Sequence, residues 1–172
     1  MAKIRKKMLA MNVGGGEMPG FFLFGGLNED GQATNTLFFI HFDIAANKEI
    51  IQKGEYVKAA PLKLTAKKFL NATGKPPCPR YAHGAAVFGN YFVVFGGRNN
   101  KLYSSEMKNL ALNDLHLFDF HKEMWVTVAM FGDMPCTRWS PTLVSSSDKL
   151  ILLGGMNLAH YCNNAVFELT FS

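Results

Sequence analysis

Residues 74–80 read Gly-Lys-Pro-Pro-Cys-Pro-Arg and residues 132–138 read Gly-Asp-Met-Pro-Cys-Thr-Arg, so the pattern G-x-x-P-C-x-R occurs twice, 58 residues apart. In both copies a Gly-Gly doublet begins 16 residues after the arginine, at Gly96 and again at Gly154. A chance match would rarely keep the glycine, the proline, the arginine and the doublet in one spacing over such a span. The chain therefore contains an internal repeat, which has to be recognised before any single motif is interpreted.

Each doublet ends a short apolar run, and a third doublet at Gly25-Gly26 does the same. The runs are Phe-Phe-Leu-Phe at 21–24, Tyr-Phe-Val-Val-Phe at 91–95 and Leu-Ile-Leu-Leu at 150–153. Such runs closed by glycine are typical of buried strands that continue into a tight turn. Further β-like runs complete the repeat units. The first unit has one at 36–42, the second has three at 84–88, 113–120 and 124–129, and the third has two at 141–145 and 164–171. One unit is therefore predicted to be a meander of four short strands.

Four-stranded units repeated at intervals of about 50 residues are typical of propeller blades. The second unit also carries landmark residues that resemble a kelch repeat, namely Arg80, His83, Gly96, Gly97, Asn113, Asp114, Leu115 and Trp125. The third unit keeps Arg138 and the doublet Gly154-Gly155 but has Pro141 where the resemblance expects histidine, and the first keeps the doublet Gly25-Gly26 and its third strand. The resemblance implies an all-β fold, a kelch-type β-propeller with about three four-stranded blades.

The resemblance also divides the chain. We expect a basic N-terminal arm at 1–6, a degenerate blade A at 7–60, blade B at 78–130, and an incomplete blade C at 136–172 that lacks its fourth strand. Residues 44–73, rich in Ala and Lys, are expected to be a linker or insertion, with a fourth strand of blade A near 55–58. This stretch either contacts a partner or is passive surface.

Three blades cannot close a ring, because propellers typically have four to eight. The predicted propeller is therefore partial, with open edges that something must cover. Three explanations stay open: the chain is a piece of a longer polypeptide, another chain such as a second copy supplies the missing blades, or the sequence omits regions.

The repeated arginines have two interpretations. Arg80 and Arg138 can clamp a carboxylate of a ligand with their forked donors, or they can tie adjacent blades by bonding backbone carbonyls or an acid such as Asp114. Their fixed spacing to the glycine doublets favours the structural role. By resemblance, His83 is expected to pack and hydrogen-bond between blades, and Trp125 to bury its aromatic ring there.

The loops that follow the doublets carry the predicted partner-binding residues. An asparagine stands two residues after each doublet, and the resemblance to kelch propellers places these loops near a ligand-binding mouth. Turn chemistry is the alternative, because Asn tolerates the left-handed conformation and bonds its own backbone. The loop of blade B adds positive charge suited to an acidic partner. The full predicted set is Asn28, Arg98, Asn99, Asn100, Lys101 and Asn157.

The sequence points to no catalytic group, no metal site and no cofactor. Its five His and three Cys show no close metal-ligand spacing, and the adjacent residues 160–162 cannot easily all face one metal ion. The odd number of cysteines indicates reduced thiols in a cytosolic setting, and no apolar stretch approaches the ~20 residues that span a bilayer. The net charge of +5 comes largely from the terminal arm and one linker, which disfavours nucleic-acid binding.

We therefore expect a non-enzymatic protein–protein interaction scaffold in the cytoplasm, a subunit of a larger assembly of the cytoskeletal or ciliary kind found among kelch proteins. The expected partners are proteins, including one that covers the open propeller edges. This step rests on family analogy. Two alternatives stay open: a kelch-type enzyme, such as an oxidase, an epimerase or a specifier, and a substrate receptor of a ubiquitin ligase.

Overall fold

The described part of the chain is all-β, as predicted. The structure, a computed structural model, describes residues 9–13, 16–42, 64–100, 111–157 and 164–171. Within these ranges it contains strands and turns but no α-helix, and hence no helix able to cross a bilayer. The chain divides into two compact units, one formed by Met1–Leu23 and Leu37–Phe69, the other by Phe24–Thr36 and Leu70–Ser172.

The first unit is built on a four-stranded sheet with the order β1-β2-β3-β4. Its strands are β1 (Leu9–Val13), β2 (Gly16–Phe24), β3 (Leu37–Phe42) and β4 (Leu64–Lys68). The packing around this sheet is aromatic, since the ring of Phe22 lies 5.1 Å from that of Phe39 and 6.2 Å from that of Phe69. A side chain at Gly20 would overlap the Phe39 ring, so glycine at this position lets β2 and β3 approach closely.

The strand β4 lies where the sequence indicated a linker. It pairs antiparallel with β3, from Phe38↔Lys68 to Phe42↔Leu64, beyond the expected end of blade A at residue 60. The stretch 55–58, where a fourth strand was expected, lies outside the described residues. Ala and Lys have low β-propensity, so it is pairing with the edge of β3, and not the local sequence, that makes this segment a strand.

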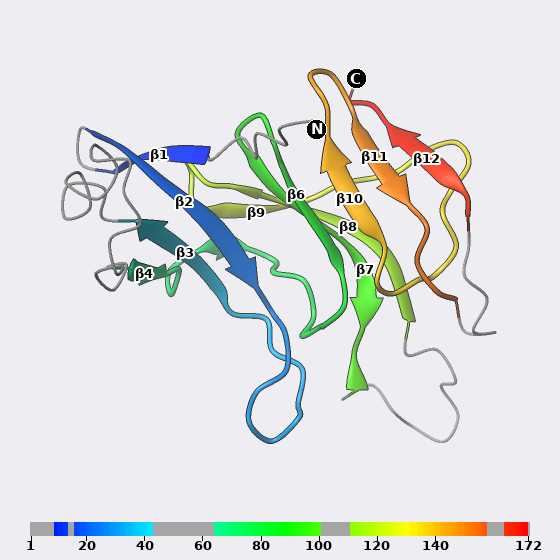
Figure 1. Ribbon diagram of the computed structural model, residues 1–172, viewed down its shortest axis with the longest axis horizontal. Coiled ribbons are helices and arrows are strands. Elements are labelled where there is room, and N and C mark those ends of the chain that lie inside the picture. The colour runs from blue at the N-terminus through cyan, green and yellow to red at the C-terminus, as the bar shows by residue number, and fades with distance from the viewer. Residues whose placement is uncertain (1–8, 14–15, 43–63, 101–110, 158–163, 172) are drawn as a thin grey trace, which may run out of the picture. The chain divides into compact units, whose positions relative to one another are not determined.

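The second unit holds two sheets. One has the order β5-β9-β8-β7-β6 and the other the order β10-β11-β12. Figure 1 shows them side by side, with β6 next to β10. The strands are β5 (Thr73–Gly74), β6 (Gly84–Phe88), β7 (Tyr91–Arg98), β8 (Ala111–Asp119), β9 (Met124–Thr127), β10 (Thr142–Ser145), β11 (Leu150–Leu153) and β12 (Val166–Leu169). Neighbouring strands are antiparallel, except that β5 lies parallel to β9.

A hydrophobic core joins the two sheets of the second unit. Its buried members are Val93, Phe95, Leu115 and Leu117 from one sheet and Leu143, Leu150 and Leu152 from the other. Burying each such side chain contributes about 2 kcal/mol, so the two sheets are expected to fold as one cooperative body.

The glycine doublets share one backbone conformation. The first glycines, Gly25, Gly96 and Gly154, have φ of 63°, 62° and 59°. The second glycines, Gly26, Gly97 and Gly155, have φ of 96°, 100° and 91°. Both values lie in the left-handed region, which glycine adopts without the steric cost that a side chain brings. The repeat in the sequence is therefore also a repeat in the backbone.

Candidate functional site

Arg80 lies at the centre of a buried, hydrogen-bonded cluster. Its guanidinium donates to both carboxylate oxygens of Asp114, at 2.7 and 2.8 Å, and to the carbonyls of Gly96 at 3.0 Å and Cys78 at 3.1 Å. The Nε2 atom of His116 lies 2.7 Å from the same carboxylate. Burial opposes the charge of Arg80, but the hydrogen bond and charge of Asp114 outweigh it and raise the pKa of Arg80. The guanidinium is therefore charged and fully engaged inside the protein.

The same contacts fix the charge of Asp114. Burial works to raise its pKa, but the hydrogen bonds from Arg80 and His116 outweigh that effect and hold the pKa of Asp114 well below its usual range. The Asp114 side chain is 41% exposed, so the ion pair sits at the border of the buried cluster. Its carboxylate stays ionised and is occupied by protein donors.

Arg138 repeats this arrangement in the third sheet without the carboxylate. Its guanidinium donates to the Gly154 carbonyl at 2.8 Å and to the Cys136 carbonyl at 3.2 Å, as Arg80 does in its own unit. The strand pairings show what replaces the acid: Val166 lies opposite Leu153, as Leu115 lies opposite Phe95. The position of Asp114 is therefore taken by the residue before Val166, which is Ala165.

The residue two positions further along the strand compensates in part. Phe167 stands in β12 where His116 stands in β8, and the Arg138 guanidinium lies 4.9 Å from the centroid of the Phe167 ring. An aromatic face attracts a cation by about 1 kcal/mol or more when water is excluded. The two sheets of the second unit thus hold equivalent buried arginines in two ways, Arg80 with an ion pair from β8 and Arg138 with an aromatic ring from β12.

Each arginine also joins its unit to the preceding doublet. The Arg80 carbonyl accepts the N–H of Gly26 at 2.9 Å, and the Arg138 carbonyl accepts the N–H of Gly97 at 2.9 Å. The side chain of the same arginine bonds the doublet that follows it by 16 residues, so one arginine links two successive doublets. This geometry agrees with the interpretation that Arg80 and Arg138 tie adjacent parts of the fold together, and not with the interpretation that they clamp a ligand carboxylate.

His83 and Trp125 both pack against Phe24. The ring centroids of Phe24 lie 5.5 Å from His83 and 5.2 Å from Trp125, and Trp125 lies 5.1 Å from Phe118. Burial, with a smaller effect from the charge of Arg80, lowers the pKa of His83 to about 4. The histidine is therefore neutral at pH 7. Its Nδ1 atom is buried and has no hydrogen-bond partner among the described residues.

Two of the predicted loop residues hold one loop in shape. The Oδ1 atom of Asn28 accepts the N–H of Gln32 at 2.8 Å, which closes the turn. Asn100, which follows β7, reaches the same loop: its Oδ1 accepts the N–H of Ala33 at 3.0 Å and its Nδ2 donates to the Gly31 carbonyl at 2.6 Å. These contacts are the turn chemistry that was the alternative to partner binding.

The other predicted loop residues are placed differently from one another. Asn99 is 2% exposed, so its amide is not presented to a partner. The guanidinium of Arg98 lies 4.5 Å from the ring centroid of Trp139, and Asn157 is half-buried. Lys101 lies outside the described residues. The described members of the predicted set therefore do not form one exposed surface.

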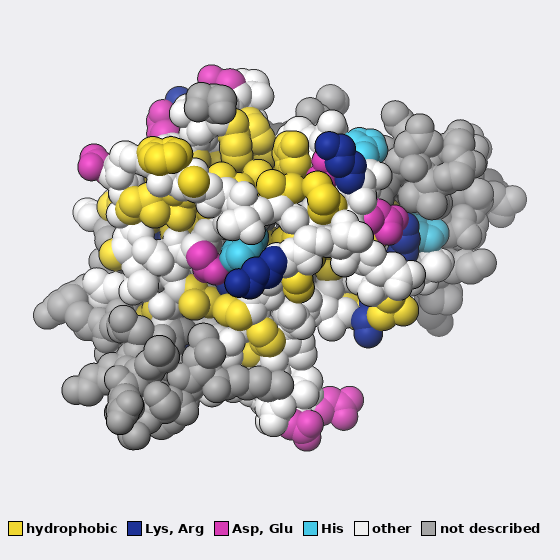
Figure 2. Space-filling view, turned by 180° about the vertical axis from the view of Figure 1, so that it is seen from behind, with side chains coloured by type: hydrophobic (Ala, Val, Ile, Leu, Met, Phe, Trp, Pro, Cys, Tyr) yellow, Lys and Arg dark blue, Asp and Glu magenta, His cyan; other side chains and the backbone are white. Residues whose placement is uncertain are grey.

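Basic side chains are not concentrated on the face shown in Figure 2. The Lys and Arg side chains there lie in separate small groups, some beside carboxylates or histidines. The loop held by Asn100 carries the exposed acids Glu29 and Asp30. An acidic partner at this loop would therefore meet carboxylates as well as Arg98.

The cysteines of the repeat, Cys78 and Cys136, are outside any disulfide, and their sulfurs contact the arginines. The sulfur of Cys78 lies 3.3 Å from Nη2 of Arg80, and that of Cys136 lies 3.4 Å from Nη2 of Arg138. In the described ranges, no three His, Cys, Asp or Glu side chains come together as a metal site. The stretch 160–162, considered above as possible ligands of one metal ion, lies outside these ranges.

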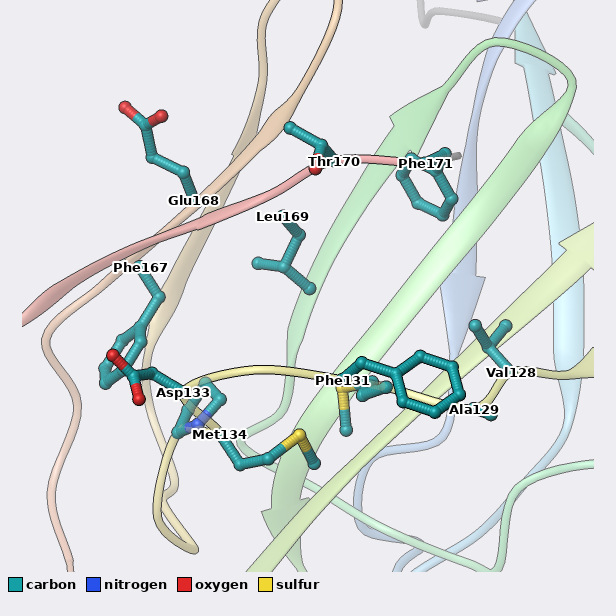
Figure 3. A pocket seen from close by; sticks show the side chains of 12 residues that line it. Val128, Ala129, Phe131, Asp133, Met134, Phe167, Glu168, Leu169, Thr170 and Phe171 are labelled. Carbon is teal, nitrogen blue, oxygen red and sulfur yellow. The ribbon is translucent and has the colours of Figure 1, made fainter.

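A cleft borders the outer edge of β12, where sequence analysis placed no site. It has a volume of about 400 Å³ and is lined by residues 128–131, 133–135 and 167–171. Figure 3 shows Leu169 pointing from β12 toward the segment that carries Phe131, while Glu168 points the opposite way. Several apolar side chains at this edge are exposed, among them Phe131 at 91%, Val166 at 60% and Met134 at 45%.

Comparison with known proteins decides the family. The model of the KLHDC2/KLHL20/DRC7 Kelch-repeats domain matches residues 16–172. The chain belongs to this family. The predicted kelch resemblance and the predicted fold class are therefore confirmed, because the kelch match covers β2 to β12 of an all-β structure.

Three curated relatives show the range of proteins that carry similar kelch sequence. "Tip elongation aberrant protein 1" of Schizosaccharomyces pombe is 28% identical over 149 residues, which cover 86% of this chain and 11% of that protein. "N-(sulfonatooxy)prop-2-enimidothioate sulfolyase" of Thlaspi arvense is 38% identical over 85 residues, 49% of this chain and 23% of that protein. "Kelch domain-containing protein 2" of Bos taurus is 39% identical over 84 residues, 48% of this chain and 19% of that protein. The chain thus spans about a tenth to a quarter of the length of these relatives.

The cleft is the feature of this kelch chain that sequence reasoning missed. Phe131 and Met134 lie in the segment that connects two units, and connecting segments carry no periodic pattern that distinguishes a partner contact from a turn. One signal was available: Phe131 lies 58 residues after Thr73, so the repeat assigns both positions the same role. The role of Thr73 becomes visible only in the structure, where it belongs to the parallel strand β5.

Proposed function

We propose that this chain is a non-enzymatic protein–protein interaction module of a larger assembly, and that it contacts its partner at the outer edge of β12. We further propose that its three sheets are the blades predicted from the repeat, the last with three strands. The observation that carries the proposal is the group of exposed apolar side chains Phe131, Met134 and Val166, beside a strand whose outer edge is unpaired among the described residues. Edges of this kind are ready to pair with another chain, and exposed apolar clusters mark interaction sites.

The buried arginines support a contact away from their own site, because protein groups already occupy their hydrogen-bond donors. The donors of Arg80 and Arg138 bond carbonyls, a thiol and, for Arg80, the carboxylate of Asp114. A ligand carboxylate would have to displace these bonds in a buried site. The loop predicted to form a mouth is likewise held by Asn28 and Asn100, so partner contact through that loop and through Arg98, Lys101 or Asn157 is a weaker part of the proposal.

The wider setting is also part of the proposal. Reduced thiols at Cys78 and Cys136 suit the reducing cytoplasm. A cytoskeletal or ciliary assembly remains our proposal for the larger complex; the printed name of the fission-yeast relative refers to tip elongation.

A photo-crosslinking experiment tests the proposed contact. Replacing Phe131 by benzoylphenylalanine in the tagged protein, expressed in its own cells, is expected to give crosslinks to a protein partner. The matched control places the same group at Leu70, which is 74% exposed in the same unit but far from β12 in the sequence. Crosslinking at position 131 that does not exceed that at position 70 would contradict the proposal.

A second candidate function is enzymatic, because one relative is named as a sulfolyase and is 38% identical over half of this chain. Its test is a metal analysis of the purified protein together with a sulfolyase assay on the chain. Stoichiometric iron or copper together with turnover would favour the enzyme over the interaction module.

A further inference from the structure

The loop that connects β2 to β3 carries the single Asp-Gly step of the sequence, Asp30-Gly31. Both residues are exposed, and so are their neighbours Glu29 and Gln32. The backbone nitrogen that follows an aspartate can attack the carboxyl carbon of that side chain. Glycine hinders this attack least, because it has no Cβ and restricts the backbone least. Of the aspartates in the sequence, Asp30 is therefore the one best placed for ring closure on the main chain.

The surroundings of Gly31 leave room for this reaction. Its φ is 69°, in the left-handed region, and a Cβ atom added there would meet nothing within 4 Å. The Asp30 side chain can therefore turn toward the Gly31 nitrogen without displacing a packed neighbour. The obstacle to the reaction is not crowding but the hydrogen bonds that the glycine makes.

Two hydrogen bonds hold the reacting peptide group in place. The N–H of Gly31 donates to the Asn28 carbonyl at 2.9 Å, and the Gly31 carbonyl accepts a bond from Nδ2 of Asn100 at 2.6 Å. Asn100 is itself fixed to the loop, because its Oδ1 atom accepts the N–H of Ala33 at 3.0 Å. The Gly31 nitrogen has to lose its proton and turn toward Asp30 before it can react. Both bonds oppose that movement, so the reaction needs a local opening of the loop.

We propose that Asp30-Gly31 is a site of spontaneous backbone modification, and that Asn100 sets its rate by holding the loop closed. The Gly31 nitrogen attacks the Cγ atom of the protonated Asp30 carboxyl group, a C–N bond forms, a C–O bond breaks, and one water leaves to give a cyclic imide. Water then adds to one of the two imide carbonyls and opens the ring. The products are aspartate or isoaspartate, and no oxidant or reductant is needed.

The modification would remove the contacts that restrain it. Isoaspartate inserts one additional carbon atom into the main chain before Gly31. The turn is closed by bonds from Gly31 to the Asn28 carbonyl and from the Gln32 N–H to the Asn28 side chain at 2.8 Å, and a longer main chain no longer fits both. Asn100 would then lose its acceptor on Gly31. The product is therefore a loop released from the residue that follows β7, and its formation requires no partner.

Ageing of the purified chain at neutral pH tests the site. Peptide mapping by mass spectrometry is expected to show, for the peptide that contains Asp30, a form lighter by one water and an isomer of unchanged mass. Asp133 and Asp148 are internal controls, since both are exposed but are followed by residues with side chains, Met134 and Lys149. Their peptides should stay unmodified. Modification at position 30 no faster than at these two positions overturns the proposal.

Variants of Asn100 test the hold on the loop. Asn100→Ala loses the bonds to Gly31 and Ala33, and it should raise the modification rate about fivefold or more. Asn100→Asp keeps an acceptor for Ala33 but loses the donor to Gly31, so it should also raise the rate. The matched control is Asn35→Ala, which removes a bond from the same segment to the Pro77 carbonyl at 3.3 Å and should leave the rate unchanged. Thermal unfolding checks that each variant is folded.

A synthetic peptide of residues 24–36 gives the rate without any hold. It should react faster than the intact chain, with the Asn100 variants between the two. Equal rates in the peptide and the intact chain overturn the proposed protection of the site. Equal rates in the unchanged chain and in a folded Asn100 variant overturn the role assigned to Asn100.

Discussion

Removing Asp114 tests how the kelch arginine is held, because the chain contains both arrangements of that arginine. In Asp114→Ala the buried guanidinium of Arg80 loses two hydrogen bonds of 2.7 and 2.8 Å. Breaking a buried ion pair typically costs about 3–5 kcal/mol, but Asp114 is 41% exposed, so water screens part of the loss. We expect the free energy of unfolding to fall by about 2 kcal/mol.

Combining this change with His116→Phe recreates the environment of Arg138. His116→Phe alone is expected to cost about 1 kcal/mol through the lost hydrogen bond to Asp114. The double variant should be less destabilised than the sum of the two, with a coupling of about 2 kcal/mol. About half of that coupling reflects the shared Asp114–His116 bond, and half reflects the new aromatic face for Arg80.

A leucine control separates the two parts. The cycle with His116→Leu removes the same hydrogen bond but offers no aromatic face, so its coupling is expected to be about 1 kcal/mol. Urea unfolding followed by tryptophan fluorescence measures all variants. Equal couplings in the Phe and Leu cycles would refute the reasoning that an aromatic ring replaces the carboxylate.

Three further predictions follow from the same unit. The pKa of His83 is about 4 in the folded state and about 6.5 in the unfolded state, so between these pH values the unfolded chain binds one more proton than the folded chain. The free energy of unfolding, measured with urea, should therefore fall by about 2 kcal/mol from pH 7 to pH 5. His83→Gln should remove that pH dependence. Gly74→Ala should lower the melting temperature more than Gly132→Ala, because both share the strain of a positive φ and only the former overlaps Trp125. Asn100→Ala loses two hydrogen bonds and should speed limited proteolysis in the loop that it holds, with the global unfolding free energy changed by about 1 kcal/mol or less.

The fold was predictable because its decisive requirements are local. A left-handed turn after a strand favours glycine, so the doublets at Gly25, Gly96 and Gly154 marked three strand ends in the sequence. The fixed spacing from Arg80 and Arg138 to their doublets likewise reflects one side-chain bond, from the guanidinium to the first glycine of the doublet.

The remaining features depend on tertiary context. β4 has the composition of a solvated linker and becomes a strand by pairing with β3. Asn99 follows its doublet as Asn28 does, yet one side chain is buried and the other is exposed, which spacing alone does not distinguish. The β12 cleft depends on the connecting segment that carries Phe131 and Met134, which has no periodic pattern in the sequence.

The most direct measurement of the central claim is hydrogen exchange of the β12 amides. Comparison of the isolated chain with the same chain purified in its native complex should show Val166–Leu169 exchanging faster in the isolated chain and slowed at least tenfold in the complex, while the amides of β8 stay equally protected in both. If β12 exchanges alike in the two samples, the edge of the last sheet is not where this kelch chain holds its partner.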